Sequence, residues 1–314
     1  MTSEKKIAVI GGGTGIYSVL TGLKKQPVKL SAIVSMADNG GSTGVLREEF
    51  GVLPPGDIRR ALVALSESEE LLCDLFNYRF KEGSLEGHNF GNLFLTALSK
   101  MEDDFQRGVE QAMTLLNVQG KVLPVTTEDT QLHAELENGK VINGETNIDV
   151  PKHDGNLKIE ETFLKPECSI NPKAKKNLKE ADAIVVGPGD LYTSIVPNLL
   201  VEGVPEAIEE SSADKFYVCN LMTKFGETNG FTASDFVKVI KNHLQSLDYV
   251  LVNDKKPSEE RIKEYEEEKA EFVTYEQLKE QDFKIIKEDL IRESGYIRHD
   301  PQKTAKVIFN NVNT

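Results

Sequence analysis

Apolar runs alternate with helix-like stretches along most of this chain. Each run is continuous rather than alternating, which is typical of strands in a parallel sheet that is covered on both faces. The order of strand and helix signals predicts an α/β fold with a doubly wound, mainly parallel sheet. The predicted strands are "KIAVI" at 6–10, "KLSAIV" at 29–34, "ADAIVVG" at 181–187, "KFYVCNLM" at 215–222 and "YVLVN" at 249–253.

Two stretches depart from this rhythm. Residues 120–165 show alternating apolar and polar positions and an Asn-Gly turn signal, which predict a β insertion made of antiparallel hairpins. Residues 257–293 are densely charged but keep a partial apolar stripe at helical spacing, which predicts a solvent-exposed helical region. We expect one domain over residues 1–314 that carries both features.

Composition and charge narrow the function. The chain has 314 residues, 39% hydrophobic content and a formal net charge of −14, so it can bury a full core but lacks the excess of Lys and Arg that coats nucleic acid. No run approaches the roughly 18 apolar residues of a membrane span, and the N-terminus has no signal-peptide core. We expect a cytoplasmic protein that binds neither nucleic acid nor membrane, so an anionic ligand must be caught locally.

The first predicted strand ends in the glycine-rich stretch "GGGTGIYS". Glycines allow a sharp turn and let backbone amides approach a ligand, and the following helix adds its unpaired N–H groups and positive dipole end. Ser18 stands where the third glycine of a dinucleotide fingerprint belongs, so the match is incomplete. The stretch predicts a phosphate loop at Gly13, Thr14 and Gly15, with a tight packing turn as the alternative.

The second predicted strand ends in another such stretch, "MADNGGSTGVL". Asp38 is placed to take ribose hydroxyls in a dinucleotide-binding fold. The residues after it form a second amide-rich nest, which a simple NAD site does not need. Two such loops at one sheet edge predict a ligand with two phosphates, or with one phosphate and a second polar half; the residues of the second nest are Asn39, Gly40, Gly41 and Ser42.

Three further segments add candidate residues. Asp57, ahead of a predicted helix, is interpreted as its N-cap, with a ligand role as the alternative. His88 and Asn92 stand at another helix start, where they either meet the ligand or serve capping and packing. The strand "ADAIVVG" leads into a third glycine loop, whose candidate ligand residues are Gly187, Gly189, Asp190 and Tyr192.

These segments together resemble the gluconeogenesis factor family, within the superfamily that also contains 2-phospho-L-lactate transferase. The resemblance covers nearly the whole chain in order. The matching stretches are "GGGTG", "ADNGGSTGVLREEFGVLPPGDIRRALVAL", "GHNFGNLFLTAL", "GPGDLYTSIVPNLLVEGVPEAI" and "MTKFGETNGFTASDFVKVI". It implies a Rossmann-like three-layer αβα fold, a cytoplasmic homodimer, UDP-sugar binding, and a role in cell shape (morphogenesis) and in growth on gluconeogenic carbon sources.

Two positions depart from the family pattern. Asn39 replaces the second of a usual pair of aspartates, which removes a carboxylate that Mg²⁺ could use, and Asp190 stands where many relatives carry Ser. No nucleophile or paired acid and base is recognisable beside the loops, so no catalytic residue and no metal ligand are assigned.

We therefore expect a regulatory protein that binds a UDP-sugar, UDP-N-acetylglucosamine first among them, and reports to a cell-wall precursor enzyme. Arg298 is a candidate counter-ion for the diphosphate and Tyr265 a candidate for stacking on the base, with surface charge and core packing as the alternatives. An enzyme of the 2-phospho-L-lactate transferase type, with a guanosine diphosphate donor and Mg²⁺ held by Asp38, is the first alternative function. NAD binding is the second.

Overall fold

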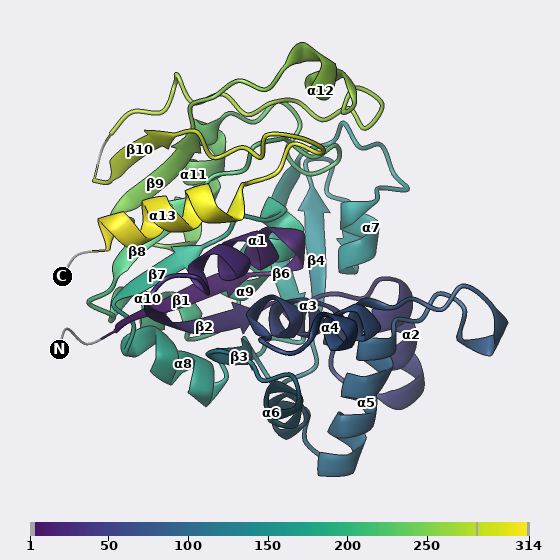
Figure 1. Ribbon diagram of the computed structural model, residues 1–314. Helices are drawn as coiled ribbons and strands as arrows, with labels where there is room; N and C mark the ends of the chain where they lie inside the picture. The colour runs from purple at the N-terminus through teal and green to yellow at the C-terminus, as the bar shows by residue number, and fades with distance from the viewer. Residues whose placement is uncertain (1–3, 281, 313–314) are drawn as a thin grey trace.

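A parallel sheet runs through the molecule, and its strands include all five of the predicted apolar segments. The structure is a computed structural model that describes residues 4–280 and 282–312 (Figure 1). Within these residues the sheet has the order β10-β9-β8-β7-β1-β2-β3 and every neighbouring pair is parallel. Its strands are β1 (Lys5–Gly11), β2 (Val28–Val34), β3 (Lys121–Pro124), β7 (Ala183–Val186), β8 (Asp214–Val218), β9 (Tyr249–Asn253) and β10 (Lys284–Glu288).

The strand order reverses between β1 and β7. From β1 the chain proceeds outward through β2 to β3, and from β7 it proceeds in the opposite direction through β8 and β9 to β10. Val9 pairs with Ala32 on one side and with Val185 on the other, and all three side chains are fully buried. Open α/β sheets bind ligands at the carboxyl ends of the strands that flank such a reversal. The predicted α/β fold is confirmed, and this edge of the sheet is where a site is expected.

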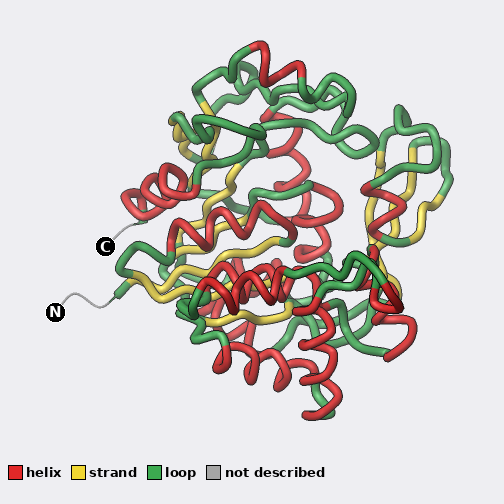
Figure 2. The backbone as a smooth tube through the Cα atoms, turned by 45° about the vertical axis from the view of Figure 1, so that its right-hand side comes forward, coloured by secondary structure: helices red, strands yellow, loops and turns green. Residues whose placement is uncertain are grey.

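Helices cover both faces of the sheet (Figure 2). In Figure 1, α1 (Gly13–Leu23), α3 (Pro55–Leu65) and α13 (Pro301–Asn311) lie in front of the sheet. No helix within the described residues is long and apolar enough to cross a membrane. The remaining helices are α2 (Gly41–Phe50), α4 (Glu70–Asn77), α5 (Phe90–Glu102), α6 (Phe105–Leu115), α7 (Glu145–Asp149), α8 (Pro172–Lys179), α9 (Val196–Leu199), α10 (Val204–Glu209), α11 (Ala233–His243) and α12 (Glu259–Lys263), with a 3₁₀ turn at Gly83–Leu85 and a π-helical turn, η2, at Leu191–Ile195.

The predicted β insertion forms a small antiparallel sheet, although it begins later than expected. Its strands are β5 (Val141–Asn143), β4 (Gln131–Leu136) and β6 (Ile159–Lys165), in that spatial order. The first apolar run of the predicted insertion is β3, which instead pairs with β2 in the main sheet. Buried and exposed positions alternate along β4, as the sequence pattern indicated. The short helix α7 follows β5 and packs against this sheet.

The predicted helical region at 257–293 was wrong for most of its length. Helix α12 has five residues, and the segment then continues through turns to β10, which adds to the edge of the main sheet beside β9. The partial apolar stripe has another use: Ile262, Tyr265 and Phe272 pack on a small cluster that includes Leu221. The sequence pattern did not indicate this strand, because "KIIKE" is mostly charged and has only one buried side chain, that of Ile286.

Candidate functional site

A cavity of about 730 Å³ opens at the carboxyl ends of β8, β7 and β1, where the strand order reverses. The first and third glycine loops form one wall of it, and segments from β8 onward form the other. The residues that line it include Gly12, Gly13, Thr14, Gly15, Asp149, Pro188, Gly189, Asp190, Asn220, Lys224, Tyr265, Tyr296, Arg298 and His299. The position of this cavity matches the place where α/β sheets bind ligands.

The first and third glycine loops touch each other through their backbones. A Cβ built on Gly15 would lie 2.1 Å from the carbonyl oxygen of Pro188. No side chain fits at that distance, so glycine is required here for the packing of one loop on the other. The tight turn that the sequence left as an alternative is therefore present, at the wall of the cavity.

Asp57 is hydrogen-bonded to the first glycine loop. It lies in the first turn of α3, whose N-cap is Pro54, so the predicted N-cap role of Asp57 was wrong. Its buried carboxylate accepts a hydrogen bond from the amide of Gly13 and pairs with Arg60 at 2.9 Å. Burial raises the pKa of Asp57, which Arg60 opposes and the nearby charge of Asp38 reinforces. One amide predicted to meet a phosphate is thus already bonded to a carboxylate.

The second glycine loop lies outside the set of lining residues. The Asp38 carboxylate accepts a hydrogen bond from the Gly40 amide at 2.8 Å, and its backbone carbonyl accepts one from Arg47 at 3.1 Å. Asn39 turns toward the small sheet, where its Oδ1 accepts bonds from the amide and the hydroxyl of Thr146, both at 3.0 Å. The side chain that replaces the expected second aspartate therefore connects the loop to α7.

Ser42 brings His88 and Asn92 to the second loop. Its hydroxyl lies 3.2 Å from Nδ1 of His88 and accepts a bond from Asn92 at 3.4 Å. Asn89 is the N-cap of α5, and Asn92 also accepts a bond from the buried Arg59 at 3.1 Å. The predicted helix start is therefore confirmed, and a ligand role for His88 and Asn92 stays a prediction.

Aromatic and cationic side chains also line the cavity. The rings of Tyr265 and Tyr296 meet edge to face with centroids 6.4 Å apart, and the guanidinium of Arg298 lies 5.5 Å from the centroid of Tyr296. The hydroxyl of Tyr265 donates to the carbonyl of Ile297 at 3.3 Å, and burial raises the pKa of Tyr265. Both predicted residues thus line the cavity, and Tyr265 also serves the packing that was its alternative role. Sequence reasoning missed Tyr296.

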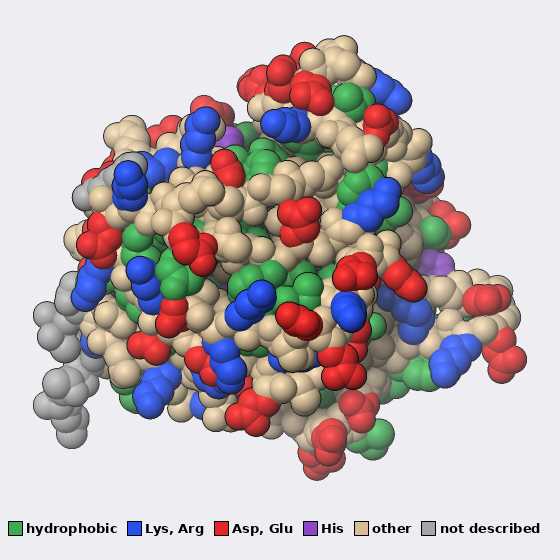
Figure 3. Space-filling model, turned by 90° about the horizontal axis from the view of Figure 1, so that it is seen from above, with side chains coloured by type: hydrophobic (Ala, Val, Ile, Leu, Met, Phe, Trp, Pro, Cys, Tyr) green, Lys and Arg blue, Asp and Glu red, His purple; other side chains and the backbone are tan. Residues whose placement is uncertain are grey.

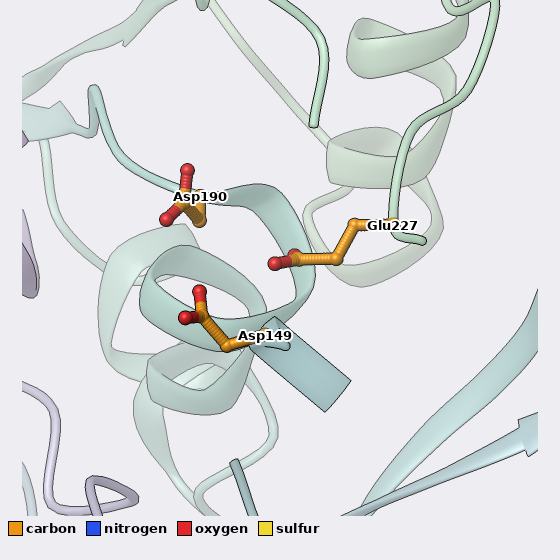
Figure 4. A group of neighbouring side chains, drawn as sticks. All are labelled: Asp149, Asp190 and Glu227. Carbon is orange, nitrogen blue, oxygen red and sulfur yellow. The ribbon is translucent and has the colours of Figure 1, made fainter. Parts of the chain in front are cut away.

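The carboxylates of Asp149, Asp190 and Glu227 lie close together beside the third glycine loop (Figure 4). One oxygen or more of each lies within 4.8 Å of the others, and Lys224 forms ion pairs with Asp149 and, at 3.0 Å, with Asp190. We call these four residues the Lys224 clasp. Its carboxylates come from α7, the third loop and the loop after β8, so it joins three separate parts of the chain.

Glu227 is the fixed member of the clasp. It is buried and accepts bonds from the amide of Tyr192 and the hydroxyl of Thr193, both at 3.1 Å. Burial and then the charge of Asp190 raise the pKa of Glu227 to about 8, against the opposing effect of Lys224. Burial also raises the pKa of Tyr192 to about 12, so its hydroxyl stays protonated.

Lys224 is the cation of the clasp. Burial alone would lower its pKa, but Asp190, Glu227 and Asp149 outweigh that effect and raise it above the ordinary value. Its side chain is 31% exposed and faces the cavity. Lys224 lies in the stretch "MTKFGETNGFTASDFVKVI", but no pattern in the sequence pairs it with Asp149, which lies 75 positions away.

The predicted ligand residues fall into two groups. Some line the cavity, and a ligand there would touch them: Gly13, Thr14, Gly15, Gly189, Asp190, Tyr265 and Arg298. The rest lie on the second loop or behind the third loop, outside the lining: Asp38, Asn39, Gly40, Gly41, Ser42, His88, Asn92, Gly187 and Tyr192. The three predicted glycine loops are adjacent, but only the first and third line this cavity.

The charged side chains that line the cavity set the local charge of the candidate site. On the face seen in Figure 3, acidic and basic side chains are interspersed. Among the described residues that line the cavity, Lys224 and Arg298 carry the permanent positive charges. An anionic ligand in the cavity can therefore pair with Lys224 or with Arg298.

Known proteins of the same fold share this sequence closely. Residues 7–291 match the family model described as 2-phospho-L-lactate transferase CofD. The gluconeogenesis factor of Bacillus subtilis (strain 168) is 43% identical over 317 residues, covering 99% of each chain. That of Halalkalibacterium halodurans is 42% identical over 319 residues, covering 98% of this chain and 96% of its own.

A solved structure agrees with the arrangement described above. The crystal structure of a member of the UPF0052 family from Bacillus halodurans superposes with a TM-score of 0.94 at 42% identity, covering 98% of this chain and 100% of the other. Together with the near full-length match to the gluconeogenesis factors, this likeness confirms the resemblance that the sequence suggested. The chain therefore belongs to the gluconeogenesis factor family, within the larger group matched by the 2-phospho-L-lactate transferase CofD model.

Proposed function

We propose that this protein is a regulatory protein that binds a UDP-sugar, with UDP-N-acetylglucosamine as the preferred ligand. One observation carries the proposal: the cavity at the strand reversal is lined both by glycine loops and Lys224 and by Tyr265, Tyr296 and Arg298. Backbone amides and cations suit phosphates, and aromatic rings suit a base. The volume of about 730 Å³ also fits a nucleotide-sized ligand, since small-molecule sites span roughly 300–1,000 Å³.

The biological part of the proposal rests on the relatives. Proteins named gluconeogenesis factors support a role in growth on gluconeogenic carbon sources. We extend this to cell shape, with a cytoplasmic homodimer that reports UDP-sugar supply to a cell-wall precursor enzyme. Binding would favour one conformation of the loops around the cavity, which requires only a difference in affinity between two states.

A transferase of the 2-phospho-L-lactate type, using a guanosine diphosphate donor, is the second candidate, and the family model favours it. Asp38 and Asp57 support this reading, because their carboxylates approach each other closely enough to influence their charges. Oxygen ligands of this kind suit Mg²⁺, which would supply charge neutralisation for a diphosphate. NAD is a weaker candidate. The carboxylate of Asp38, which would accept hydrogen bonds from the ribose hydroxyls of NAD, already accepts one from the Gly40 amide and lies outside the cavity lining.

A thermal-shift panel of UDP-N-acetylglucosamine, GDP and NAD, each with and without Mg²⁺, ranks these candidates. We expect the UDP-sugar to stabilise most, by about 2.7 kcal/mol at a hundredfold excess over Kd, because stabilisation follows RT ln(1 + [L]/Kd). A larger effect of GDP with Mg²⁺ would favour the transferase, and a larger effect of NAD would reverse the ranking.

Chromatography of the nucleotide after incubation separates binding from catalysis. The regulatory reading expects UDP-N-acetylglucosamine to be recovered unchanged in the presence of Mg²⁺, because no nucleophile has been found beside the loops. Catalytic conversion that disappears in Asp38→Ala would replace the regulatory reading with the enzymatic one.

A further inference from the structure

The short helix α7 is attached at both ends to loops of the nucleotide site. At its start, the amide and hydroxyl of Thr146 donate to Asn39 on the second glycine loop, both at 3.0 Å. At its end, Asp149 forms an ion pair with Lys224 on the loop after β8. α7 belongs to the small sheet, so these two attachments connect that sheet to the edge of the main sheet where the ligand is expected.

The attachment at Asp149 differs from the one at Thr146, because it uses a group that faces the cavity. Lys224, Asp149 and Asp190 all line the cavity, with side chains that are 31%, 28% and 41% exposed. Glu227 is held by two further hydrogen bonds and does not depend on Lys224 for a partner. Lys224 can therefore change partners without leaving Glu227 unsatisfied.

We propose that Lys224 exchanges the carboxylate of Asp149 for the phosphate oxygens of a diphosphate ligand, and so frees the end of α7 when the cavity fills. This inference rests on the proposed function, because it requires a ligand with a diphosphate in this cavity. It adds a mechanism by which ligand binding changes the structure outside the cavity. The first and third glycine loops supply the amides, Lys224 supplies the charge, and α7 carries the change to the small sheet.

Charge explains why such an exchange is near balance. A diphosphate carries more negative charge than a carboxylate and binds ammonium groups strongly. In the clasp, however, Lys224 already has Asp149 and Asp190 as partners, so the ligand must compete with them. The same two carboxylates repel the incoming phosphates. Asp149 and Asp190 therefore cost ligand affinity, and removing the charge of either one raises that affinity.

Titration calorimetry with UDP-N-acetylglucosamine tests this directly. Lys224→Met, which removes the charge and keeps the length, is expected to weaken binding roughly tenfold. Asp149→Asn is expected to tighten binding about threefold, because Lys224 is released and one repelling charge is lost. Glu160→Gln is the matched control: it removes a carboxylate from the exposed face of β6 in the same small sheet and leaves affinity unchanged.

Hydrogen exchange at the amides of α7 supplies a second readout, which a merely structural ion pair would not give. Ligand should accelerate exchange at the end of α7 in the wild type, and Asp149→Asn should show the faster exchange without ligand. Slower exchange of α7 on binding, or weaker binding by Asp149→Asn, would overturn the proposal. Lys224→Arg keeps the charge and should bind within about threefold of the wild type.

Failure of this inference can be told apart from failure of the proposed function. If the wild type binds GDP or inorganic pyrophosphate but not UDP-N-acetylglucosamine, the proposed ligand is wrong, and the same variants are measured with the diphosphate that binds. If Lys224→Met and Asp149→Asn then change affinity in the same direction, the exchange is wrong whatever the ligand. A wild type that binds none of the three overturns both proposals. Stabilisation by Mg²⁺ alone, lost in Asp149→Asn, would instead make the clasp a cation site.

Discussion

The first and second glycine loops read alike in the sequence but occupy different surroundings. The first loop lines the cavity and packs against the backbone of the third loop, with Gly15 at the contact. The second loop begins α2, where a Cβ on Gly41 would meet nothing within 4 Å, and its side chains bond to α7 and to His88. One loop is a wall of the site, and the other is a junction between the main sheet and the small sheet.

This difference teaches what a glycine-rich loop signifies after a parallel strand. Glycine gives a backbone the freedom to approach something closely, but the sequence does not say what is approached. At Gly15 of the first loop it is the backbone of Pro188. In the second loop, a Cβ on Gly44 would lie 2.3 Å from the carbonyl oxygen of Asn39, whereas a Cβ on Gly41 would meet nothing within 4 Å. The consequences of substitution should therefore differ sharply between Gly15 and Gly41, and four measurements break or sharpen the contrast.

Gly15→Val should have the largest effect. Its Cβ would lie 2.1 Å from the Pro188 carbonyl oxygen, so the two loops must separate. We expect the free energy of unfolding to fall by about 3 kcal/mol or more, measured by urea denaturation. A variant of wild-type stability would show that the first and third loops do not pack as described.

Glu227→Gln sharpens the account of what supports the third loop. The folded state keeps the proton of Glu227 up to its raised pKa of about 8, whereas the unfolded chain loses it near the ordinary value of 4.5. Wild-type stability therefore contains a term that is full below about pH 4.5 and is lost as the pH rises to about 8. Glutamine cannot ionise, and its carbonyl oxygen still accepts from Tyr192.

The free energy of unfolding of Glu227→Gln relative to the wild type should consequently rise steadily as the pH increases through that window. Urea denaturation at a series of pH values measures it. A gap that is constant with pH would mean that Glu227 is ionised in the folded state at all pH values tested.

Gly41→Val is the matched partner of Gly15→Val. Gly41 has a φ of +42° in open space, so the new side chain meets no atoms but strains the backbone. We expect a loss of about 1–2 kcal/mol in the free energy of unfolding. A loss equal to that of Gly15→Val would erase the contrast between the two loops.

Thr146→Ala should have the smallest effect. It removes the hydroxyl bond to Asn39 but leaves the amide bond from the same residue at 3.0 Å. A loss of about 0.5–1 kcal/mol is expected, by the same denaturation assay. A loss above that of Gly41→Val would mean that α7 depends on this contact far more than its two bonds suggest.

The sequence was informative wherever one periodicity dominated. All five apolar runs became strands of one parallel sheet, because continuous burial leaves a clear pattern. The strand β10 was missed, since at the sheet edge its side chains are mostly exposed and charged. The segment 257–293 therefore suggested a helix where the chain forms turns and a strand.

The candidate site was harder to predict for a different reason. Glycine loops can be recognised from local sequence, so three of them were predicted. Which of these loops line the same cavity depends on tertiary packing, which local sequence does not reveal. Lys224 and Asp149 meet only because the small sheet folds back over the third loop, and Tyr296 reaches the cavity from a segment just before α13. No local spacing connects such residues, so they could be found only in three dimensions.

The most direct test of the account is a hydrogen-exchange footprint of UDP-N-acetylglucosamine on the wild-type protein. The account predicts slower exchange in the first loop, the third loop and the segment 296–299, which all line the cavity. It predicts little change at His88 and Asn92, beside the second loop. Protection confined to the second loop and the start of α5, with none at 296–299, would contradict the assignment of this cavity as the nucleotide-sugar site.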